Sequence, residues 1–207
     1  MERLATGIPV LDRELGGGLP TGSVVVLKAD PSSQSELFLN TFTHVRETLY
    51  LTTVRTADAV ADALSTSAVP TGDPRIEAID GTEPIQDSLD RVSTLPDGGT
   101  LIVDSAEPLE NTEPDRYRSF LGDLREAVDD ANAIGVIHAL DTGPRSRNRV
   151  VSEQVADVVF DLRTTVTATE IVNRLAVTKF RGGAALEEPV KLKLTDTVSV
   201  DTSRDIA

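Results

Sequence analysis

A run of β-branched and leucine residues at 24–27 (VVVL) constrains the fold of this chain more than any other feature. A short continuous apolar run is typical of a strand covered on both faces, and a polar loop and an amphipathic helical pattern follow it. The same order of apolar strand and helix repeats up to about residue 157. This alternation predicts right-handed βαβ crossovers and an α/β fold, with a mainly parallel central sheet flanked by helices.

The remaining elements follow from the same periodicities. We expect further strands at 48–53, 75–79, 100–104 and 134–140, helices at 10–15, 33–47, 57–64, 84–95 and 115–131, and acidic and polar loops at 106–114 and 141–148. Short strands at 158–166, 170–179, 190–195 and 198–200 should extend the sheet in antiparallel fashion. The chain is therefore expected to form a single domain over residues 1–207, with a glycine-rich N-terminal motif (1–22), an α/β core (23–157) and an antiparallel β extension (158–207).

The composition is strongly acidic. The formal charge is −14, the pI is about 4.5, and the sequence has only four lysines. This exceeds what solubility in ordinary buffer needs and favours a halophilic protein from a salt-adapted cytoplasm over a merely acidic mesophilic one. No apolar signal core opens the chain, and no stretch approaches the roughly 18 apolar residues of a membrane span, so we expect a cytoplasmic protein without membrane partners. The absence of cysteine excludes disulfides and thiolate metal sites.

The loop at residues 28–35 (KADPSSQS) lies where a strand-loop-helix protein would bind phosphate. A working P-loop reads G-x-x-x-x-G-K-[ST], because glycines bring backbone N–H groups onto phosphate, the lysine reaches the β- and γ-phosphates, and the hydroxyl holds Mg²⁺. Only Ser35 matches this pattern, and Gln34 stands in place of the lysine with a neutral amide. Pro31 removes one N–H donor and Asp30 adds negative charge. These changes argue against tight binding of ATP.

Four other segments occur in a fixed order along the chain: TGIPVLD at 6–12, GGGLPTG at 16–22, LIVDS at 101–105 and VTKFRG at 177–182. Together they resemble the KaiC and RadA-like branch of the RecA superfamily of ATPases; the third is similar to its Walker B strand and the fourth to its Lys-x-Arg-Gly signature. The resemblance implies a RecA-like P-loop NTPase fold with a degenerate Walker A. It also implies self-association, or assembly with a RecA-family paralogue, in rings or filaments.

The resemblance also implies where a nucleotide would lie. A degenerate pocket would be built from Lys28, Ser32, Ser33, Gln34, Ser35 and Asp104. Ser35 and Asp104 would hold a metal only if Mg-nucleotide binds; otherwise Asp104 is a strand-end carboxylate hydrogen-bonded to Ser35 or to a backbone amide. The helix N-terminus still offers free N–H groups, with Ser32 or Ser33 as its N-cap, and Lys28 could swing inward. No cofactor is expected, and Mg-ATP is the alternative.

The resemblance further implies that hydrolysis is lost. Val54 and Arg55 replace the paired glutamates that polarise the attacking water, and neither side chain can act as a general base at neutral pH. Lys179 and Arg181 match residues that reach the nucleotide of a neighbouring subunit in assembled relatives. Alternatively, they are surface cations that hold a subunit contact.

A lone histidine and an acidic segment complete the polar candidates. His138 lies in the expected strand at 134–140, and we interpret it as a hydrogen-bonded core residue because nothing in the sequence pairs it with a base or a metal. Glu107, Glu110 and Glu113 show no defined ligand spacing, so they are expected to form a solvated acidic loop.

Arg145, Arg147 and Arg149 form the only local basic cluster of the sequence. They fall in a loop that corresponds to the DNA-contacting loop of recombinase relatives. Three cations are few against a net charge of −14, and the loop has no aromatic residue for base stacking, so binding of nucleic acid is not expected.

The preferred interpretation is a catalytically degenerate KaiC/RadA-like protein. It would be a regulatory or assembly module that acts through protein–protein contacts, with weak or no ATP hydrolysis. The alternatives are an ATP-binding KaiC-like ATPase that uses a non-standard P-loop, and an accessory protein of DNA recombination or repair. The fold argument alone does not choose among them, because one RecA-like scaffold carries many functions.

Overall fold

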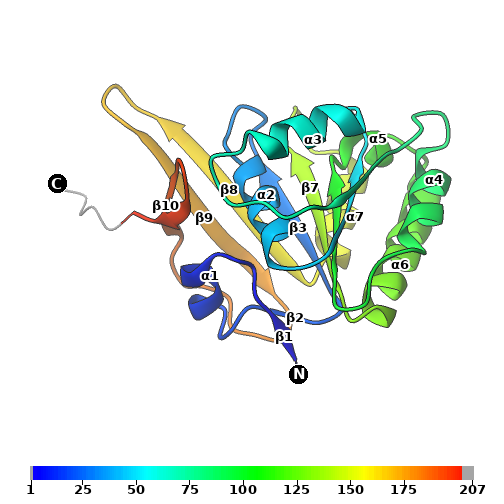
Figure 1. The fold of residues 1–207 in the computed structure, drawn as a ribbon, viewed down its shortest axis with the longest axis horizontal. Coiled ribbons are helices and arrows are strands. Elements are labelled where there is room, and N and C mark those ends of the chain that lie inside the picture. Colours follow the sequence, from blue (N-terminus) through cyan, green and yellow to red (C-terminus); the bar gives the residue numbers. More distant parts are fainter. Residues whose placement is uncertain (1, 202–207) are drawn as a thin grey trace.

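The computed structural model describes residues 2–201, and in this range a nine-stranded sheet has the order β11-β10-β9-β8-β3-β7-β6-β4-β5 (Figure 1). Its strands are β3 (Ser23–Ala29), β4 (Thr48–Thr52), β5 (Arg75–Ala78), β6 (Thr100–Asp104), β7 (Ile134–Leu140), β8 (Val158–Val166), β9 (Ile171–Phe180), β10 (Val190–Leu194) and β11 (Val198–Val200). A separate pair joins β1 (Arg3–Leu4) to β2 (Leu19–Pro20). Residues 202–207 of the expected β extension lie outside the described residues.

The sheet changes from parallel to antiparallel at β8. Strands β5, β4, β6, β7, β3 and β8 pair in parallel, and β8 to β11 pair antiparallel in chain order. The parallel strands are joined through helices, whereas the antiparallel strands follow each other without an intervening helix, through segments 167–170, 181–189 and 195–197. The predicted fold class, a mainly parallel sheet with C-terminal antiparallel strands, is confirmed.

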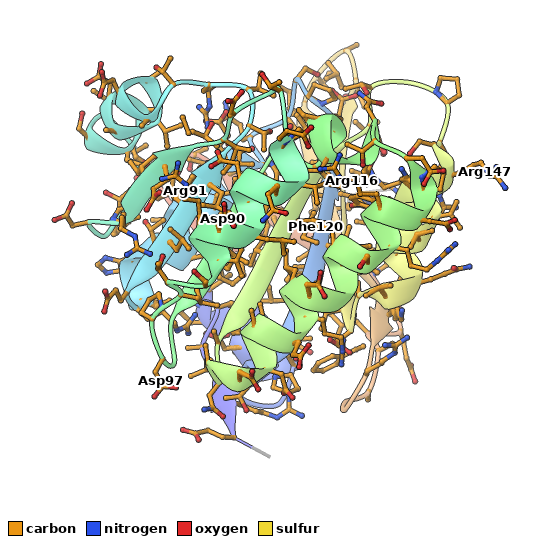
Figure 2. The ribbon with its side chains drawn as sticks, turned by 90° about the vertical axis from the view of Figure 1, so that its right-hand side faces the viewer. Asp90, Arg91, Asp97, Arg116, Phe120 and Arg147 are labelled. Carbon is orange, nitrogen blue, oxygen red and sulfur yellow. The ribbon has the colours of Figure 1, made fainter. Side chains whose placement is uncertain are left out.

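Helices cover both faces of the sheet. They are α1 (Pro9–Glu14), α2 (Glu36–Val45), α3 (Ala57–Ser65), α4 (Pro84–Val92), α5 (Glu107–Glu110), α6 (Pro114–Asp130) and α7 (Arg147–Val155). Helices α1, α2 and α3 contribute to one hydrophobic core, and α4, α5, α6 and α7 to the other. In Figure 2, α4 and α6 run across the sheet, and Phe120 packs from α6 into the second core. Within residues 2–201, no helix has both the length and the apolar character needed to cross a membrane.

The two predicted loops are loops over residues 111–113 and 141–146, but a helix that the pattern did not predict occupies part of the first and another begins at the end of the second. The acidic segment 106–114 contains α5, where Leu109 and Glu110 are buried. The polar segment 141–148 leads into α7, whose buried residues are Asn148, Arg149 and Ser152. A helix that buries such side chains lacks the apolar stripe by which a sequence pattern identifies a helix.

The register places polar residues side by side at one edge of the sheet. Asp104 ends β6, and its partners across the two neighbouring ladders are Thr52 of β4 and His138 of β7. Parallel strands present their carboxyl ends at the same edge, where open α/β sheets bind their ligands. The loop that follows β3 reaches this same edge and brings Ser35 to it.

Candidate functional site

A cavity of about 160 Å³ lies at the carboxyl edge of the sheet, and its lining includes Ser33, Ser35, Arg55, Asp104 and His138. These residues come from the loop before α2, the segment after β4, the end of β6 and strand β7. Sequence reasoning placed Ser33, Ser35 and Asp104 in one pocket, and the structure brings them together. It also places His138 and Arg55 there, which had been assigned no common site.

A hydrogen-bonded series joins three of these residues. His138 Nδ1 lies 2.7 Å from Asp104 Oδ1, and His138 Nε2 lies 3.0 Å from Ser35 Oγ. All three residues are buried. In the tautomer that carries its proton on Nδ1, the ring donates to the carboxylate and Nε2 accepts from the Ser35 hydroxyl. His138 is therefore a hydrogen-bonded core residue, as predicted, but it also stands between the two residues expected to hold Mg²⁺.

The second oxygen of Asp104 is occupied as well. The Tyr50 hydroxyl donates to Asp104 Oδ2 at 2.6 Å, and Arg55 Nη2 donates to the same atom at 2.8 Å. Burial of Asp104 raises its pKa, but the hydrogen bond and electrostatic interaction with His138, the hydrogen bond from Tyr50 and the charge of Arg55 outweigh it and lower the pKa to about 2. The carboxylate is therefore ionised throughout the physiological range.

Tyr50 belongs to the candidate site through its contact with Asp104, and the sequence pattern did not predict this. It lies within the buried strand β4, and burial followed by the negative charge of Asp104 raises the pKa of its hydroxyl. A tyrosine inside a buried strand has a hydroxyl that needs a partner, and this was the available signal. The partner could not be identified without the strand order, which sets β4 beside β6.

The loop after β3 is folded by its own side chains. Ser32 donates to the Asp30 carboxylate through its backbone N–H at 2.8 Å and through its hydroxyl at 2.5 Å. These hydrogen bonds lower the pKa of Asp30. The expected N-cap at Ser32 or Ser33 is wrong: α2 begins after Ser35, whose side chain makes no capping bond because it is bonded to His138. Gln34 is exposed.

Lys28 does not replace the missing lysine of the loop. Its Nζ lies 3.7 Å from Glu153 Oε1 and 3.6 Å from Asp161 Oδ2, so two carboxylates of α7 and β8 hold it. The predicted inward swing of Lys28 is therefore not observed. Glu153 was missed by sequence reasoning, because nothing in the pattern of the unrecognised helix α7 marks it as a partner.

Val54 and Arg55, which the resemblance aligns with a pair of glutamates, take different positions in the structure. Val54 is 71% exposed, whereas Arg55 reaches inward and joins Asp104 to Glu36, 3.2 Å from its Oε2. Burial lowers the pKa of Arg55, but the hydrogen bond and the charge of Asp104 outweigh it and raise the pKa. Arg55 therefore carries its positive charge directly beside the Asp104 carboxylate, and a guanidinium cannot act as a general base at neutral pH.

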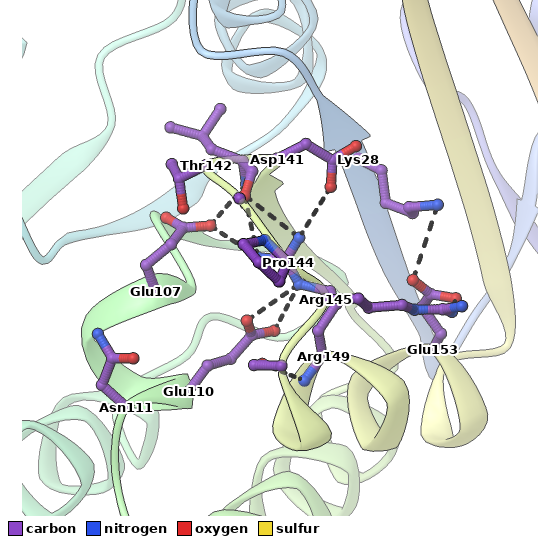
Figure 3. A pocket seen from close by; sticks show the side chains of 13 residues that line it. Lys28, Glu107, Glu110, Asn111, Asp141, Thr142, Pro144, Arg145, Arg149 and Glu153 are labelled. Atoms are coloured by element: carbon purple, nitrogen blue, oxygen red, sulfur yellow. Dashed lines mark hydrogen bonds and ion pairs between the residues drawn. The ribbon is translucent and has the colours of Figure 1, made fainter.

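The arginine cluster is not a basic surface. Figure 3 shows Arg149 pointing into a second, larger cavity between α5 and α7, where its Nε donates to Glu110 Oε1 at 2.8 Å and its Nη2 to Glu107 Oε1 at 2.7 Å. Arg145 pairs with Glu153. Only Arg147 of the three points away from the protein (Figure 2).

The same contacts correct the expected acidic loop. Glu110 is 6% exposed and pairs with Arg149 rather than facing solvent, and Glu107 also accepts the backbone N–H of Leu140 at 2.6 Å. The exposed Glu113 instead accepts the N–H of Asp115 and caps α6. Acidic residues of the segment 106–114 and Arg149, from the segment 141–149, therefore form one network of ion pairs in the structure.

Lys179 and Arg181 contact their own chain. Lys179 Nζ donates to the carbonyl oxygens of Glu153 and Gln154, each at 2.8 Å, and Arg181 donates to the carbonyl oxygen of Gln154 at 2.9 Å. Both side chains therefore neutralise the carboxyl end of α7. The burial of Lys179 and the nearby charge of Arg181 lower the pKa of Lys179. Within residues 2–201, no group of three or more His, Cys, Asp or Glu side chains could hold a metal ion.

Comparisons with known proteins support the fold. The model of a family of unknown function, DUF7125, matches residues 3–207. No curated protein matches the chain. Among solved structures, the KaiC-like protein PH0186 from the hyperthermophilic archaeon Pyrococcus horikoshii OT3 is similar, with a TM-score of 0.77, 16% sequence identity and coverage of 97% of this chain and 99% of that chain. The chain therefore has a KaiC-like, RecA-type fold.

Proposed function

The chain belongs to the DUF7125 family of unknown function, and we propose that it is a catalytically degenerate KaiC-like protein that acts through protein contacts rather than by hydrolysing ATP. It would serve as a regulatory or assembly module for a second copy of itself or for a RecA-family paralogue. The proposal has two halves, the loss of the nucleotide site and the presence of a protein contact.

The observation that carries the first half is the position of the His138 ring between Ser35 and Asp104. In a P-loop protein the corresponding hydroxyl and carboxylate serve the metal ion of the Mg-nucleotide. Here the ring bonds to both residues, and Arg55 already supplies a cation to Asp104. The residues present therefore do not fit a Mg-nucleotide.

The phosphate side of the site supports the same conclusion. Gln34 supplies no charge, and Lys28 is held by Glu153 and Asp161. Backbone dipoles at the start of α2 do not replace the cation that a triphosphate requires. Since Arg55 also stands in place of a general base, both binding and hydrolysis lack the side chains on which relatives of this fold type depend.

An exposed apolar pair supports the second half. Val166 and Ile171 face each other across the β8–β9 hairpin, and they are 73% and 67% exposed. The hairpin projects beyond the helical layers (Figure 1). Paired β-branched side chains at the end of a projecting hairpin offer a small apolar surface that a partner can bury, so we place the protein contact there.

Calorimetric titration with Mg-ATP in molar KCl tests the nucleotide half. We expect no binding by the unaltered protein, and none by Gln34→Lys alone, because the His138 ring remains. Gln34→Lys combined with His138→Ser should bind, since a cation is then restored and the ring is removed. Gln86→Lys with His138→Ser adds the same charge on α4 and serves as the control. Micromolar binding with turnover by the unaltered protein would refute the proposal.

The two alternative functions have their own tests. An ATPase that uses Lys28 would lose nucleotide binding in Lys28→Ala, and we expect no binding in either form because this lysine is already ion-paired. A DNA accessory would give a salt-sensitive gel shift that the triple Arg→Ala variant of the cluster abolishes. We expect no shift at any salt concentration, because Arg149 is buried and Arg145 is paired.

A further inference from the structure

The order of contacts at the cavity matches a nucleophilic serine site. The Ser35 hydroxyl faces one ring nitrogen of His138 at 3.0 Å, and the Asp104 carboxylate faces the other at 2.7 Å. This is the arrangement in which a histidine takes the proton of a serine while a carboxylate fixes the ring, and it recurs on unrelated folds. It is recognised from geometry and not from sequence order.

The supporting residues hold this arrangement on rigid elements. His138 and Asp104 are direct neighbours in the parallel ladder between β7 and β6, so their backbones are fixed relative to each other. Tyr50 and Arg55 anchor the other oxygen of Asp104. The carboxylate therefore cannot turn away from the ring, and the ring keeps Nε2 directed at Ser35. A catalytic site requires surrounding residues that hold its side chains in the reactive geometry in this way.

The cavity supplies space and hydrogen-bond donors beside the hydroxyl. Its volume of about 160 Å³ equals roughly five water molecules at about 30 Å³ each, which suits a short acyl group. Ser33 is among the residues that line it, and the buried hydroxyl oxygen of Ser33 has no hydrogen-bond partner in the described part of the chain. Glu36 begins α2, and a backbone N–H at the first helical position has no intrahelical acceptor. Both groups can donate to a carbonyl oxygen.

We propose that Ser35, His138 and Asp104 form a nucleophilic serine site that accepts short-chain acyl groups from activated esters. This activity goes beyond the proposed regulatory function and needs neither nucleotide nor metal. In this site Ser35 is the nucleophile, His138 is the general base and Asp104 orients the ring. Ser33 and the Glu36 N–H stabilise the oxyanion that develops on the substrate.

The chemistry balances with the residues present and water. Ser35 Oγ forms a bond to the carbonyl carbon while its proton moves to His138 Nε2. When the tetrahedral intermediate collapses, the ester C–O bond breaks and His138 returns the proton to the leaving alkoxide. Water then attacks the acyl-serine with His138 again taking a proton, which releases the carboxylic acid and restores the hydroxyl.

Covalent labelling tests the proposal on the unaltered full-length protein. Methanesulfonyl fluoride is small enough for the cavity, and we expect one sulfonyl group per chain, mapped to Ser35 by peptide mass spectrometry. With p-nitrophenyl acetate we expect a burst of nitrophenol that labelled protein no longer gives. Absence of labelling at Ser35 overturns the proposal, whatever the folding of any variant.

Variants then separate a nucleophilic site from a structural network. Ser35→Ala should abolish labelling, and His138→Gln should slow it by about 100-fold, which is the usual loss when a general base is removed. Ser146→Ala is the matched control: this serine caps helix α7 and has no histidine partner, so labelling should be unchanged. Equal labelling rates in the unaltered protein and in His138→Gln would contradict the proposal, since only a general base links His138 to the rate.

The absence of cysteine allows a second measurement. Ser35→Cys introduces the only thiol of the chain, so its alkylation by iodoacetamide reports on this position alone. We expect at least about tenfold faster alkylation than in Ser35→Cys combined with His138→Gln, because a neighbouring base raises the thiolate fraction. Equal rates would count against the proposal. Neither readout involves ATP, so binding of Mg-ATP in the calorimetric test would refute the proposed function and leave this result standing.

Discussion

Arg149 Nε lies 2.8 Å from Glu110 Oε1, and both side chains are buried between α5 and α7. Burial lowers the pKa of Arg149, but the hydrogen bond and the charge of Glu110 outweigh it and raise the pKa. This ion pair connects the two helices that the sequence does not reveal. The buried Arg149 should therefore contribute more to the free energy of unfolding than the exposed Arg147 of the same helix.

Removing this buried cation should destabilise the fold strongly. Arg149→Met leaves Glu110 buried without its partner, and a broken buried pair typically costs about 3–5 kcal/mol. Arg147→Met, at an exposed position of the same helix, should change the free energy of unfolding by less than about 0.5 kcal/mol. Urea unfolding of both variants in the same buffer measures the difference. Equal stabilities would show that the network around Glu110 contributes nothing.

The depressed pKa of Asp104 makes a defined contribution to stability at low pH. Its folded pKa of about 2 lies below the ordinary value of an aspartate, 3.8, so the stabilisation is complete above about pH 4 and is lost as the pH falls through 2. At about 1.4 kcal/mol per pH unit, this contribution is about 2 kcal/mol. The difference in unfolding free energy between the unaltered protein and Asp104→Asn should therefore shrink by this amount between pH 5 and pH 2, as followed by urea unfolding at each pH. A difference that does not vary with pH would contradict the assignment.

The glycine run before β2 contains one position that only glycine can occupy. Gly18 has φ of +110°, and a Cβ there would collide with the backbone oxygen of Leu4. Gly16 also has a positive φ, +72°, but a Cβ there meets nothing within 4 Å. We expect Gly18→Ala to cost about 3 kcal/mol or more and Gly16→Ala about 1 kcal/mol, because both are strained and only one clashes. Thermal unfolding of the pair measures this; a larger loss at Gly16 would contradict it.

The proposed protein contact at the β8–β9 hairpin can be tested through its exposed apolar pair, Val166 and Ile171. Val166→Ser with Ile171→Ser removes the exposed apolar surface at the end of the β8–β9 hairpin. Sedimentation of the unaltered protein in molar KCl should show association that this double variant loses, with an unchanged circular dichroism spectrum. Thr165→Ser with Thr169→Ser alters the same hairpin without removing the apolar pair and is the control. Association that survives in the double variant would place the contact elsewhere.

Much of the fold could be predicted because its signals are local. The runs at β6 and β7 are continuous apolar segments, and the stripe of α6 repeats at helical spacing, so their bounds agree with the structure to within one residue. Helix α7 could not be predicted in this way. It buries Asn148, Arg149 and Ser152, and the reason for burying them lies in Glu110, about 40 positions earlier in the chain.

In the candidate site, too, some features follow from local sequence and others only from the tertiary structure. The sequence by itself determined the α/β fold, the neutral Gln34 at the loop position where a P-loop carries lysine, and the placement of Ser35 and Asp104 at one sheet edge, because each follows from neighbouring residues or from the parallel direction of the strands. Only the tertiary structure decided that His138 lies between Ser35 and Asp104 and that Arg55 and Tyr50 bond to Asp104. It also decided that Lys28 pairs with Glu153 and Asp161. Ser35 and His138 are separated by 103 positions, and a hydrogen bond between them depends on strand order and register, which no local pattern encodes.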